Sequence, residues 1–370
     1  MTDRILTCSR LTINLANVRA NYRKVLEQVD GIPAAAMVKA NGYGLGAAEI
    51  SVTLSKVGCT HFFVAQLSEA VAVRDVLPTV SISVLNGVMP GTEEELVLHN
   101  LTPVLNSIEQ LTRWRTHGRT IGRQLEATLH IDTGMRRLGL GDDETRALIE
   151  DPSILDGIDL RHLMSHLASA DVPDSPQPAH QLRSFRHLYQ RVQERHPSMT
   201  ASLANSAGIF LDPSYHFDLV RPGIALYGGT PLSDGTNPMQ SVVTLEAPII
   251  QVRNVIEGDT VGYGATHCMS RDGRIATVAL GYADGFLRSG SGSAQVHLAG
   301  RHVPIIGRIS MDLVTIDVSE IEAEFLYPGS PVEFIGPHCG IDDVAERAGT
   351  IANELLTDLG HRYERVYQEM

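Results

Sequence analysis

The stretch AAAMVKANGYG, residues 34–44, combines a strand signal with a chemically reactive residue. Its small apolar residues are typical of a buried strand, and that strand ends at Lys39, just before Gly42, Tyr43 and Gly44. A lysine in this position is costly unless it is paired or neutral, and loss of solvent lowers the pKa of its amine. A neutral amine can attack a carbonyl group. The stretch therefore predicts a reactive lysine, the alternative being a lysine whose ammonium group reaches solvent.

Outward from this strand, the first two thirds of the chain alternate short apolar runs with amphipathic helical segments. The candidate strands are Pro33–Lys39, Thr60–Gln66, Val80–Leu85, Leu101–Leu105, Leu125–Ile131, Leu160–Ser165, Met199–Leu203 and Asp218–Leu226. Eight runs separated by helix-length segments predict an α/β fold, an eight-stranded α/β barrel of the TIM type. Lys39, Asp132, His166, Asn205 and Arg221 lie at or just past the ends of these runs, where such barrels place their active sites.

The last third of the chain has a different texture. A turn-rich segment at 229–238 reads as a linker, and the residues after it alternate β-like runs with glycine turns. The candidate strands there are Val242–Val255, Arg274–Ala279, Ala294–Leu298, Val303–Ile306, Leu313–Val318 and Pro331–Ile335, followed by a helix around Ile341–Leu359. We therefore expect an α/β barrel over residues 1–235 and a smaller, mainly β domain over residues 236–370.

Composition excludes several classes of function. The 370 residues are 43% hydrophobic and 20% charged, as in a folded globular protein, and the formal charge of −13 argues against binding to a phosphate backbone. No apolar run approaches 20 residues and residues 1–4 do not open a signal peptide, so we expect a soluble, cytoplasmic protein. The four cysteines are scattered and the histidines show no HExxH spacing, so no metal site is predicted.

Further motifs follow the lysine stretch in a fixed order. They are IDTGMRRLG at 131–139, SH at 165–166, NSA at 205–207, LVRPGIALYG at 219–228, VGYGAT at 261–266, GYADG at 281–285 and GRISMD at 307–312. Together they resemble the alanine racemase family of fold-type III pyridoxal-phosphate enzymes, over roughly residues 8 to 367. The resemblance implies an isomerase that interconverts L-alanine and D-alanine, for peptidoglycan precursor synthesis or for alanine catabolism.

The resemblance also assigns the catalytic pair. Racemisation removes the α-proton on one face and returns it on the other, which calls for two acid/base groups and an electron sink. Lys39, which carries pyridoxal 5'-phosphate as a Schiff base in the family, is one group, and Tyr263 is the other. A tyrosine with an ordinary pKa near 10 needs neighbouring cations or donors to act as a base at neutral pH. On its own, the Gly-Tyr-Gly pattern favours the alternative that Tyr263 is a buried strand residue with a satisfied hydroxyl group, and the order of the motifs favours the catalytic role instead.

The remaining site residues are implied by the same resemblance. Tyr43, Ser206 and the backbone amides of Gly223 and Ile224 would hold the cofactor phosphate. Arg221 would face the pyridine nitrogen and, with His166, support the acid/base network; the alternative for Arg221 is a structural ion pair. The substrate carboxylate would meet Arg137, which also contacts the cofactor, and the backbone of Met311. Four further residues would line the entry corridor: Asp171, Tyr282, Arg288 and Asp312.

Three positions depart from the family pattern. His130 stands where the family often has a lysine that becomes carbamylated and orients the arginine, so the means of holding Arg137 is open. Ser202 replaces a frequent histidine, and His361 falls near a frequent tyrosine. None of these changes removes a primary catalytic group.

In the family two chains pack head to tail, so we expect a homodimer in which each barrel is completed by the other chain's β domain. A racemase for serine or another small amino acid remains the main alternative function. A non-catalytic pyridoxal-phosphate carrier is a second alternative, although such carriers are usually the barrel alone. A decarboxylase of the wider fold group is disfavoured by Arg221.

Overall fold

The structure, a computed structural model, describes residues 5–172, 174–233 and 235–369. The chain divides into two compact units, which are described separately here. The α/β unit comprises Arg19–Leu226 with Thr230–Met239. The β-rich unit comprises the N-terminal segment up to Val18, Tyr227–Gly229 and the chain from Gln240 onward. Residues 5–18 therefore belong with the last third of the chain.

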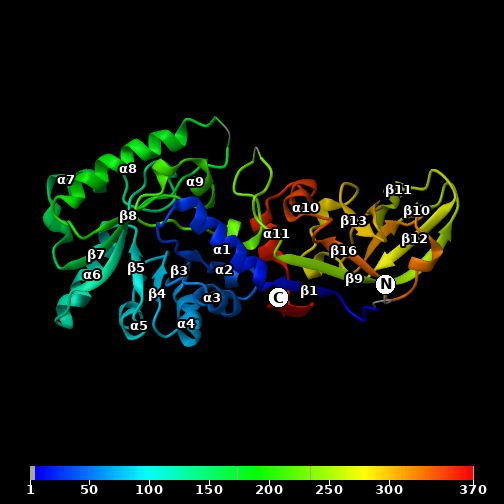
Figure 1. Ribbon diagram of the computed structural model, residues 1–370, viewed down its shortest axis with the longest axis horizontal. Coiled ribbons are helices and arrows are strands. Elements are labelled where there is room, and N and C mark those ends of the chain that lie inside the picture. Colours follow the sequence, from blue (N-terminus) through cyan, green and yellow to red (C-terminus); the bar gives the residue numbers. More distant parts are fainter. Residues whose placement is uncertain (1–4, 173, 234, 370) are drawn as a thin grey trace. The chain divides into compact units, whose positions relative to one another are not determined.

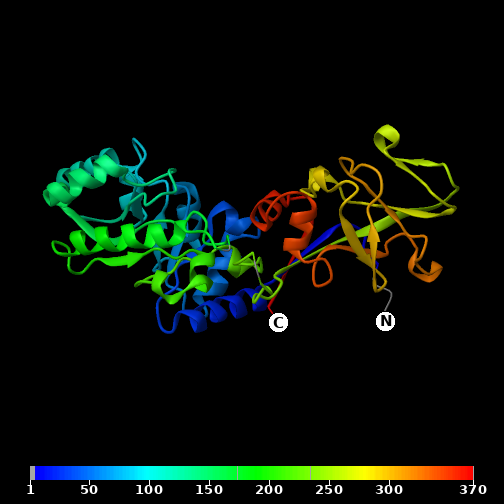
Figure 2. The same cartoon turned by 90° about the horizontal axis from the view of Figure 1, so that it is seen from above.

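The α/β unit is built on a parallel sheet of seven strands in sequence order, with helices around it (Figures 1 and 2). The strands are β2 (Ala36–Met37), β3 (His61–Val64), β4 (Ser81–Val84), β5 (Thr102–Leu105), β6 (Leu125–His130), β7 (Ile158–Met164) and β8 (Thr200–Ser202). The helices are α1 (Leu15–Val29), α2 (Lys39–Tyr43), α3 (Ala47–Ser55), α4 (Leu67–Val76), α5 (Glu93–Leu98), α6 (Ile108–Thr120), α7 (Asp142–Glu150), α8 (Gln177–Gln193) and α9 (Ser206–Leu211). Strand interiors such as that of β3 are buried, as expected for a parallel sheet with both faces covered.

The expected strand over Asp218–Leu226 forms only in part. Val220 makes an isolated parallel bridge with Ala34, and its carbonyl oxygen accepts from the Ala35 amide at 2.8 Å. On its other side, the amides of Asp218 and Arg221 donate to the carbonyl oxygens of Ala201 (3.1 Å) and Ala204 (2.9 Å). Pro222 has no amide hydrogen to continue the ladder, and residues 224–227 turn into a 3₁₀ helix. The sheet thus has seven regular strands and a hydrogen-bonded segment at 218–221.

Two histidines lie in the strands of this sheet. The His61 Nε2 atom is 2.8 Å from the Ser83 hydroxyl group, and the His162 Nδ1 atom is 2.6 Å from the Thr200 hydroxyl group. Their rings are 5.4 Å apart. Burial is the main cause that lowers the pKa of His61 to about 3 and that of His162 to about 4. Both rings are therefore neutral in the folded protein near pH 7.

This neutrality predicts an acid-sensitive fold. Below about pH 6.5 these two histidines bind protons in the unfolded chain but stay neutral in the folded protein. The free energy of unfolding therefore falls as the pH is lowered, until the folded pKa values near 3 to 4 are reached. Each such histidine contributes a slope of about 1.4 kcal/mol per pH unit. His162→Asn provides a side-chain amide that can replace the hydrogen bond of His162 to Thr200. The free energy of unfolding, measured with urea, should then fall less steeply between pH 6 and pH 5, by about that amount. His187→Asn, at an exposed position of α8, should leave it unchanged; equal slopes in both variants would contradict the prediction.

The β-rich unit holds an eight-stranded sheet. The order β14-β13-β16-β9-β1-β17 is extended by β12 and β15, with β12 also paired to β9. Two short strands, β10 (Thr260–Val261) and β11 (His267–Cys268), form a separate two-stranded sheet. The strands of the eight-stranded sheet are β1 (Arg10–Asn14), β9 (Val243–Val255), β12 (Gly273–Val278), β13 (Gln295–Leu298), β14 (Arg301–Pro304), β15 (Val314–Asp317), β16 (Pro331–Ile335) and β17 (Glu364–Gln368). The sheet is mainly antiparallel, but β1 and β17 pair in parallel. Sequence patterning missed these two strands because their pairing partners lie at opposite ends of the chain.

The single helix expected over Ile341–Leu359 is two helices, α10 (Ile341–Arg347) and α11 (Ala352–Asp358). Gly349 sits between them with a φ of 72°, which a helix interior does not allow. Within the described residues, no helix combines the length and apolar character needed to cross a lipid bilayer.

Candidate active site

Lys39 directly follows β2 and begins a turn of unusual handedness. Ala40, Asn41, Gly42 and Tyr43 have φ values of 53°, 53°, 62° and 52°, in the left-handed region. Such a conformation costs about 1–2 kcal/mol at each non-glycine residue, so the turn must be held by its surroundings. The carboxylate of Glu69 accepts a hydrogen bond from the Ala40 amide at 2.6 Å.

The same turn is held on its other side by Asn41, whose side-chain oxygen accepts from the Ala47 amide at 3.0 Å. Gly42 lies so close to Ala47 that an added Cβ atom would be 3.1 Å from its backbone. Four consecutive residues with positive φ directly follow Lys39, and such clusters of backbone strain are common at functional turns.

The surroundings of Lys39 favour the neutral form of its amine. Burial, and then the positive charge of Arg137, lower the pKa of Lys39 below its ordinary value, while Glu69 acts in the opposite direction. A lower pKa increases the fraction of neutral amine, the form that attacks carbonyl groups and accepts protons. The partial burial of Lys39 argues against the alternative of a solvated strand-end lysine.

Tyr43, Ser206 and Gly223 come together in the α/β unit. A Cβ atom at position 223 would collide with the Tyr43 hydroxyl group, so only glycine fits there. The Ser206 hydroxyl group accepts hydrogen bonds from the amides of Gly223 (2.8 Å) and Ala225 (3.3 Å). Burial raises the pKa of Tyr43 to about 12, so its hydroxyl group stays a donor. Ile224 follows at the start of the 3₁₀ helix, and the group offers hydroxyl and backbone donors suited to a bound anion.

Arg221 is almost fully buried and lies between the ends of two strands. Its guanidinium group donates to the Ser202 hydroxyl group (2.5 Å) and to the carbonyl oxygens of Ser165 (2.6 Å) and Leu203 (3.3 Å). Burial lowers the pKa of Arg221 to about 10, which still leaves it cationic at neutral pH. These partners are neutral, so the structure does not support the alternative of an ion pair with a neighbouring carboxylate.

His166 and His130 are held neutral in the same region. Burial, Arg221 and Arg137 lower the pKa of His166 well below 6.5, and burial lowers that of His130 to about 4. The His130 Nδ1 atom is 2.8 Å from the side-chain oxygen of Asn106. Because the Asn106 amide group already donates to the carbonyl oxygens of Leu85 and Val104, that oxygen acts as an acceptor. His130 therefore carries its proton on Nδ1 and leaves Nε2 as an acceptor.

The loop that carries Arg137 is built on Asp132. One carboxylate oxygen of Asp132 accepts from the amides of Gly134 (2.8 Å), Met135 (2.8 Å) and Arg136 (3.1 Å). The Arg136 side chain turns outward to Asp142 at 3.0 Å, whereas Arg137 contributes its positive charge to Lys39, His130 and His166.

Sequence reasoning missed several residues that hold this region. Glu69 had a readable signal, since an acidic residue three positions into a helix typically forms a capping box. Asn106 and Gln181 had none. Gln181 is fully buried, donates to the Thr133 hydroxyl group and the His166 carbonyl oxygen, and accepts from the Ala168 amide. These contacts join segments that are distant in sequence.

Tyr263 lies in the β-rich unit, in a 3₁₀ turn at residues 263–265, and its side chain is 72% exposed. It is flanked by Gly262 and Gly264 in left-handed conformations, and both pack beside Arg308. The exposure contradicts the alternative of a buried strand tyrosine. A side chain this exposed is available to a ligand or to another chain.

The other predicted residues of this unit lie on two adjoining loops. The amides of Tyr282 and Ala283 donate to the carbonyl oxygens of Ser310 and Met311 at 3.1 and 3.0 Å. Arg362, which sequence reasoning did not select, bridges Asp284 (3.3 Å) and Asp312 (2.8 Å). Arg288 opens a 3₁₀ helix at residues 288–290.

Asp171 belongs to the α/β unit, where its carbonyl oxygen accepts from Ser233. The predicted residues are thus divided: Lys39, Tyr43, Arg137, His166, Asp171, Ser206, Arg221, Gly223 and Ile224 lie in the α/β unit, and Tyr263, Tyr282, Arg288, Met311 and Asp312 in the β-rich unit.

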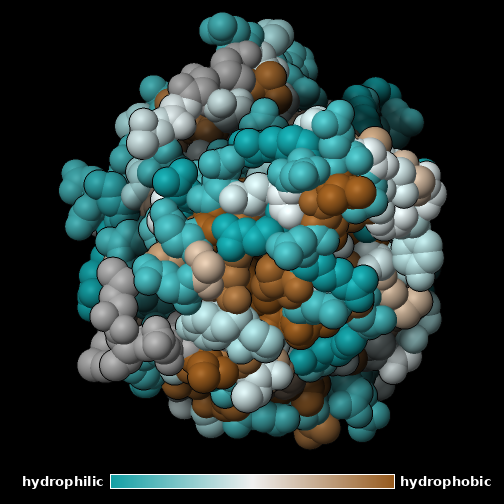
Figure 3. Space-filling view, turned by 90° about the vertical axis from the view of Figure 1, so that its right-hand side faces the viewer, coloured by the Kyte–Doolittle hydropathy of each residue, from teal (hydrophilic) through white to brown (hydrophobic). Residues whose placement is uncertain are grey.

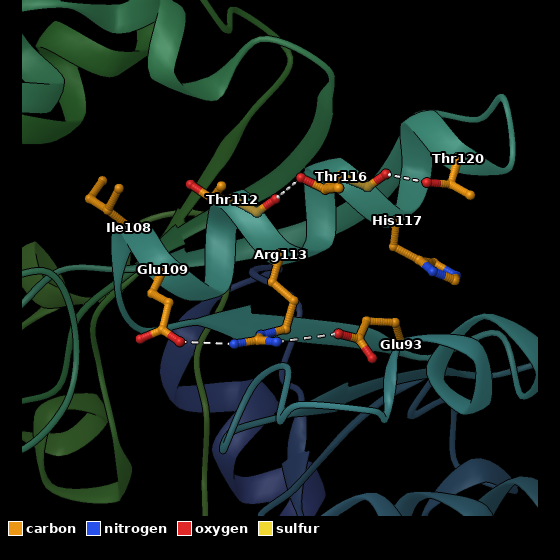
Figure 4. Close-up of a pocket in the computed structure, with 8 residues that line it drawn as sticks. All are labelled: Glu93, Ile108, Glu109, Thr112, Arg113, Thr116, His117 and Thr120. Carbon is orange, nitrogen blue, oxygen red and sulfur yellow. Dashed lines mark hydrogen bonds and ion pairs between the residues drawn. The ribbon is translucent and has the colours of Figure 1, made fainter.

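Two other surfaces of the molecule are shown in Figures 3 and 4. Figure 3 looks onto the β-rich unit and shows apolar side chains in several separate groups among polar ones. A shallow pocket runs along α6, where Arg113 pairs with Glu93 and Glu109 (Figure 4). No predicted site residue lines that pocket, so the region around Lys39 remains the candidate active site.

A partly buried lysine after the first strand of an α/β unit, followed in the chain by a β-rich unit with an exposed tyrosine, is the arrangement expected of the fold-type III pyridoxal-phosphate enzymes. Two family models match the chain: "Alanine racemase, N-terminal domain" over residues 13–231 and "Alanine racemase, C-terminal domain" over residues 242–367. The chain belongs to the alanine racemase family, and the predicted resemblance is confirmed.

Individual relatives agree with this assignment. The alanine racemase of Rhodospirillum rubrum is 45% identical over 359 residues, covering 96% of this chain and 95% of that protein. The catabolic alanine racemase of Agrobacterium fabrum is 46% identical over 358 residues, covering 96% and 91%. The crystal structure of the Bartonella henselae alanine racemase, with covalently bound pyridoxal phosphate, superposes with a TM-score of 0.93 at 37% identity and covers 98% of this chain and 100% of that one.

Proposed function

We propose that this protein interconverts L-alanine and D-alanine with pyridoxal 5'-phosphate as its cofactor. The observation that carries the proposal is the left-handed turn that directly follows the partly buried Lys39, in a chain whose relatives at about 45% identity over nearly their whole length are alanine racemases. The supply of D-alanine for the cell wall and the catabolism of alanine are both consistent with these relatives, and the cytoplasm is the compartment proposed.

The residues around Lys39 fit the cofactor. The contact between Gly223 and the Tyr43 hydroxyl group leaves room for backbone but not for a side chain, and Ser206 adds a third polar group there. These residues, with Ile224, would hold the phosphate. Arg221 would face the ring nitrogen, His166 would lie next to it, and Lys39 would bind the cofactor covalently. When bound, the cofactor withdraws electrons from the substrate and stabilises the negative charge left at Cα.

In the reaction the protein's own side chains remove one proton from the substrate Cα atom and add one proton to it. The neutral amine of Lys39 would take the α-proton of one enantiomer, and the Tyr263 hydroxyl group would return a proton on the opposite face. In the reverse direction the roles exchange. Arg308 lies beside the two glycines that flank Tyr263 and so belongs to the turn that presents this hydroxyl group.

Arg221 and Arg137 would set the charge around the reacting atoms. A guanidinium group does not readily give up its proton, so Arg221 would donate to the ring nitrogen without protonating it. That keeps the electron sink modest and favours immediate reprotonation at Cα. Arg137 would meet the substrate carboxylate together with the Met311 backbone. The Asp171, Tyr282, Arg288 and Asp312 side chains would line the approach to the site.

We further propose that residues 218–221 complete an eight-stranded barrel, which their hydrogen bonds to Ala35 on one side and to Ala201 and Ala204 on the other support. Residues 1–235 would then form the cofactor-binding barrel and residues 236–370 the domain that delivers Tyr263. We propose a head-to-tail homodimer in which each site combines Lys39 of one chain with Tyr263 of the other. The exposure of Tyr263 and Met311 supports this arrangement.

A racemase for serine or another small amino acid is the alternative, because the contacts described here do not define the size of the substrate pocket. A non-catalytic carrier is disfavoured, because the chain also matches the C-terminal domain of the family.

The experiment uses a feature of the composition: Lys24, Lys39 and Lys56 are the only lysines in the chain. Borohydride reduction of the purified holoenzyme, followed by peptide mapping, should place the cofactor on Lys39 alone. Racemisation assays across alanine, serine and other small amino acids should show the highest kcat/KM for alanine. A label on Lys24 or Lys56, or the absence of racemisation in labelled protein, would refute the proposal.

A further inference from the structure

Three histidines and one glutamate form a row of side chains in the β-rich unit. None of them belongs to the turn that carries Tyr263. His297 on β13 pairs directly with His302 on β14 and with Glu333 on β16. Residues directly opposite each other in an antiparallel sheet point to the same face, so these three side chains stand side by side. The rings of His297 and His302 are 5.6 Å apart.

A fourth side chain joins the row from the turn after β16. Residues 336–339 fold back, with the Gly336 amide donating to the Cys339 carbonyl oxygen at 2.8 Å. The turn brings the ring of His338 onto that of His297, with centroids 3.9 Å apart and planes within 7°. The His338 Nδ1 atom is 2.9 Å from one oxygen of Glu333, while the other oxygen accepts from the amides of His338 (2.8 Å) and Cys339 (3.0 Å).

The arrangement meets the requirements of a transition-metal site. One ligand atom from each of His297, Glu333 and His338 lies within 4.8 Å of the others. A tetrahedral zinc ion would draw such atoms to about 3.3 Å apart. The His338 side chain is 54% exposed on a turn and can rotate, whereas Glu333 is 13% exposed and already fixed by two amides, as the outer contacts of a metal ligand usually are.

The side chains in and around this cluster indicate which residues and which metal ion suit the site. Cys339 is buried and its Sγ atom faces the carbonyl oxygens of Glu333 and Gln295, so it is not included among the ligands. A set of imidazoles and one carboxylate suits zinc better than calcium or magnesium, which prefer oxygen ligands.

We propose that the β-rich unit binds one zinc ion per chain through His297, Glu333 and His338, with His302 or water as the fourth ligand. The ion would tie the β13–β14 hairpin to the turn that follows β16. This site is separate from the racemase chemistry and does not depend on it. Motif spacing predicted no metal, because the ligands are gathered by strand register and a turn rather than by positions along one helix.

Zinc chloride is the probe for the test. Holoenzyme is treated with a chelator, desalted and titrated with zinc chloride in a calorimeter. We expect saturation at one equivalent per chain and a higher melting temperature with zinc. His297→Gln and His338→Gln should each weaken binding at least about tenfold while racemisation stays unchanged. The matched control is His99→Gln: His99 also faces a carboxylate, Glu95 at 3.4 Å, and this pair should not affect binding.

X-ray absorption spectroscopy at the zinc K edge of the zinc-loaded, unmodified holoenzyme is a second measurement, and it needs no variant. It identifies the atoms that bind the zinc ion. It should show nitrogen and oxygen ligands only. A sulfur ligand, zinc binding that survives both His297→Gln and His338→Gln, loss of racemisation at one equivalent of zinc, or no binding at all would each overturn the proposal.

Discussion

Replacement of Lys39 by alanine is expected to abolish racemisation, with kcat falling at least about 10⁴-fold. The substitution removes two functions at once: the covalent attachment of the cofactor and one of the two proton-transfer groups. Because the left-handed turn is held by Glu69 and Asn41 rather than by the lysine side chain, the variant should fold normally. The measurement is racemisation of L-alanine and D-alanine with saturating cofactor, together with circular dichroism.

Lys24→Ala is the matched control. Lys24 lies on α1, half exposed and 3.7 Å from Glu27, and its removal should change the rate less than twofold. If Lys39→Ala kept more than about a hundredth of the activity, Lys39 could not be both the attachment point and an essential base.

The second large effect is recovery of activity when two inactive variants are mixed. Tyr263→Phe should lower kcat on the order of 10³-fold, because the ring remains but the proton-carrying hydroxyl group is lost. If each site combines Lys39 of one chain with Tyr263 of the other, a heterodimer of Lys39→Ala and Tyr263→Phe chains carries one site with both native groups. Random exchange of equal amounts should restore about a quarter of the wild-type activity, because half of the dimers have one complete site of two.

Exchange is verified by tagging one variant and recovering mixed dimers. Mixing each variant with itself is the control and should restore nothing. Full activity in a stable monomer, or no recovery in proven mixed dimers, would mean that Lys39 and Tyr263 of the same chain form the site.

Local sequence patterns determined much of the fold because each is enforced over a few residues. Apolar runs of strand length predicted the seven parallel strands, and β16 (Pro331–Ile335) has the bounds that its pattern indicates. The short local pair β10 and β11 was not predicted, and two larger failures concern pairing between distant segments. β1 and β17 were missed because they pair with each other across the whole chain, and the strand expected at Asp218–Leu226 is interrupted by Pro222, which cannot donate.

The family could also be read from the motifs, since eight of them in a fixed order over most of the chain are difficult to produce by chance. The physical state of the side chains depends instead on contacts between segments that are distant in the chain. The lowered pKa of Lys39 depends on burial and on Arg137, almost a hundred positions away, and the proton of His130 is placed by Asn106. The row of His302, His297, Glu333 and His338 likewise exists only because strand register and one turn bring it together. Burial and distance between segments set these properties, and neither is encoded in the spacing of residues along the chain.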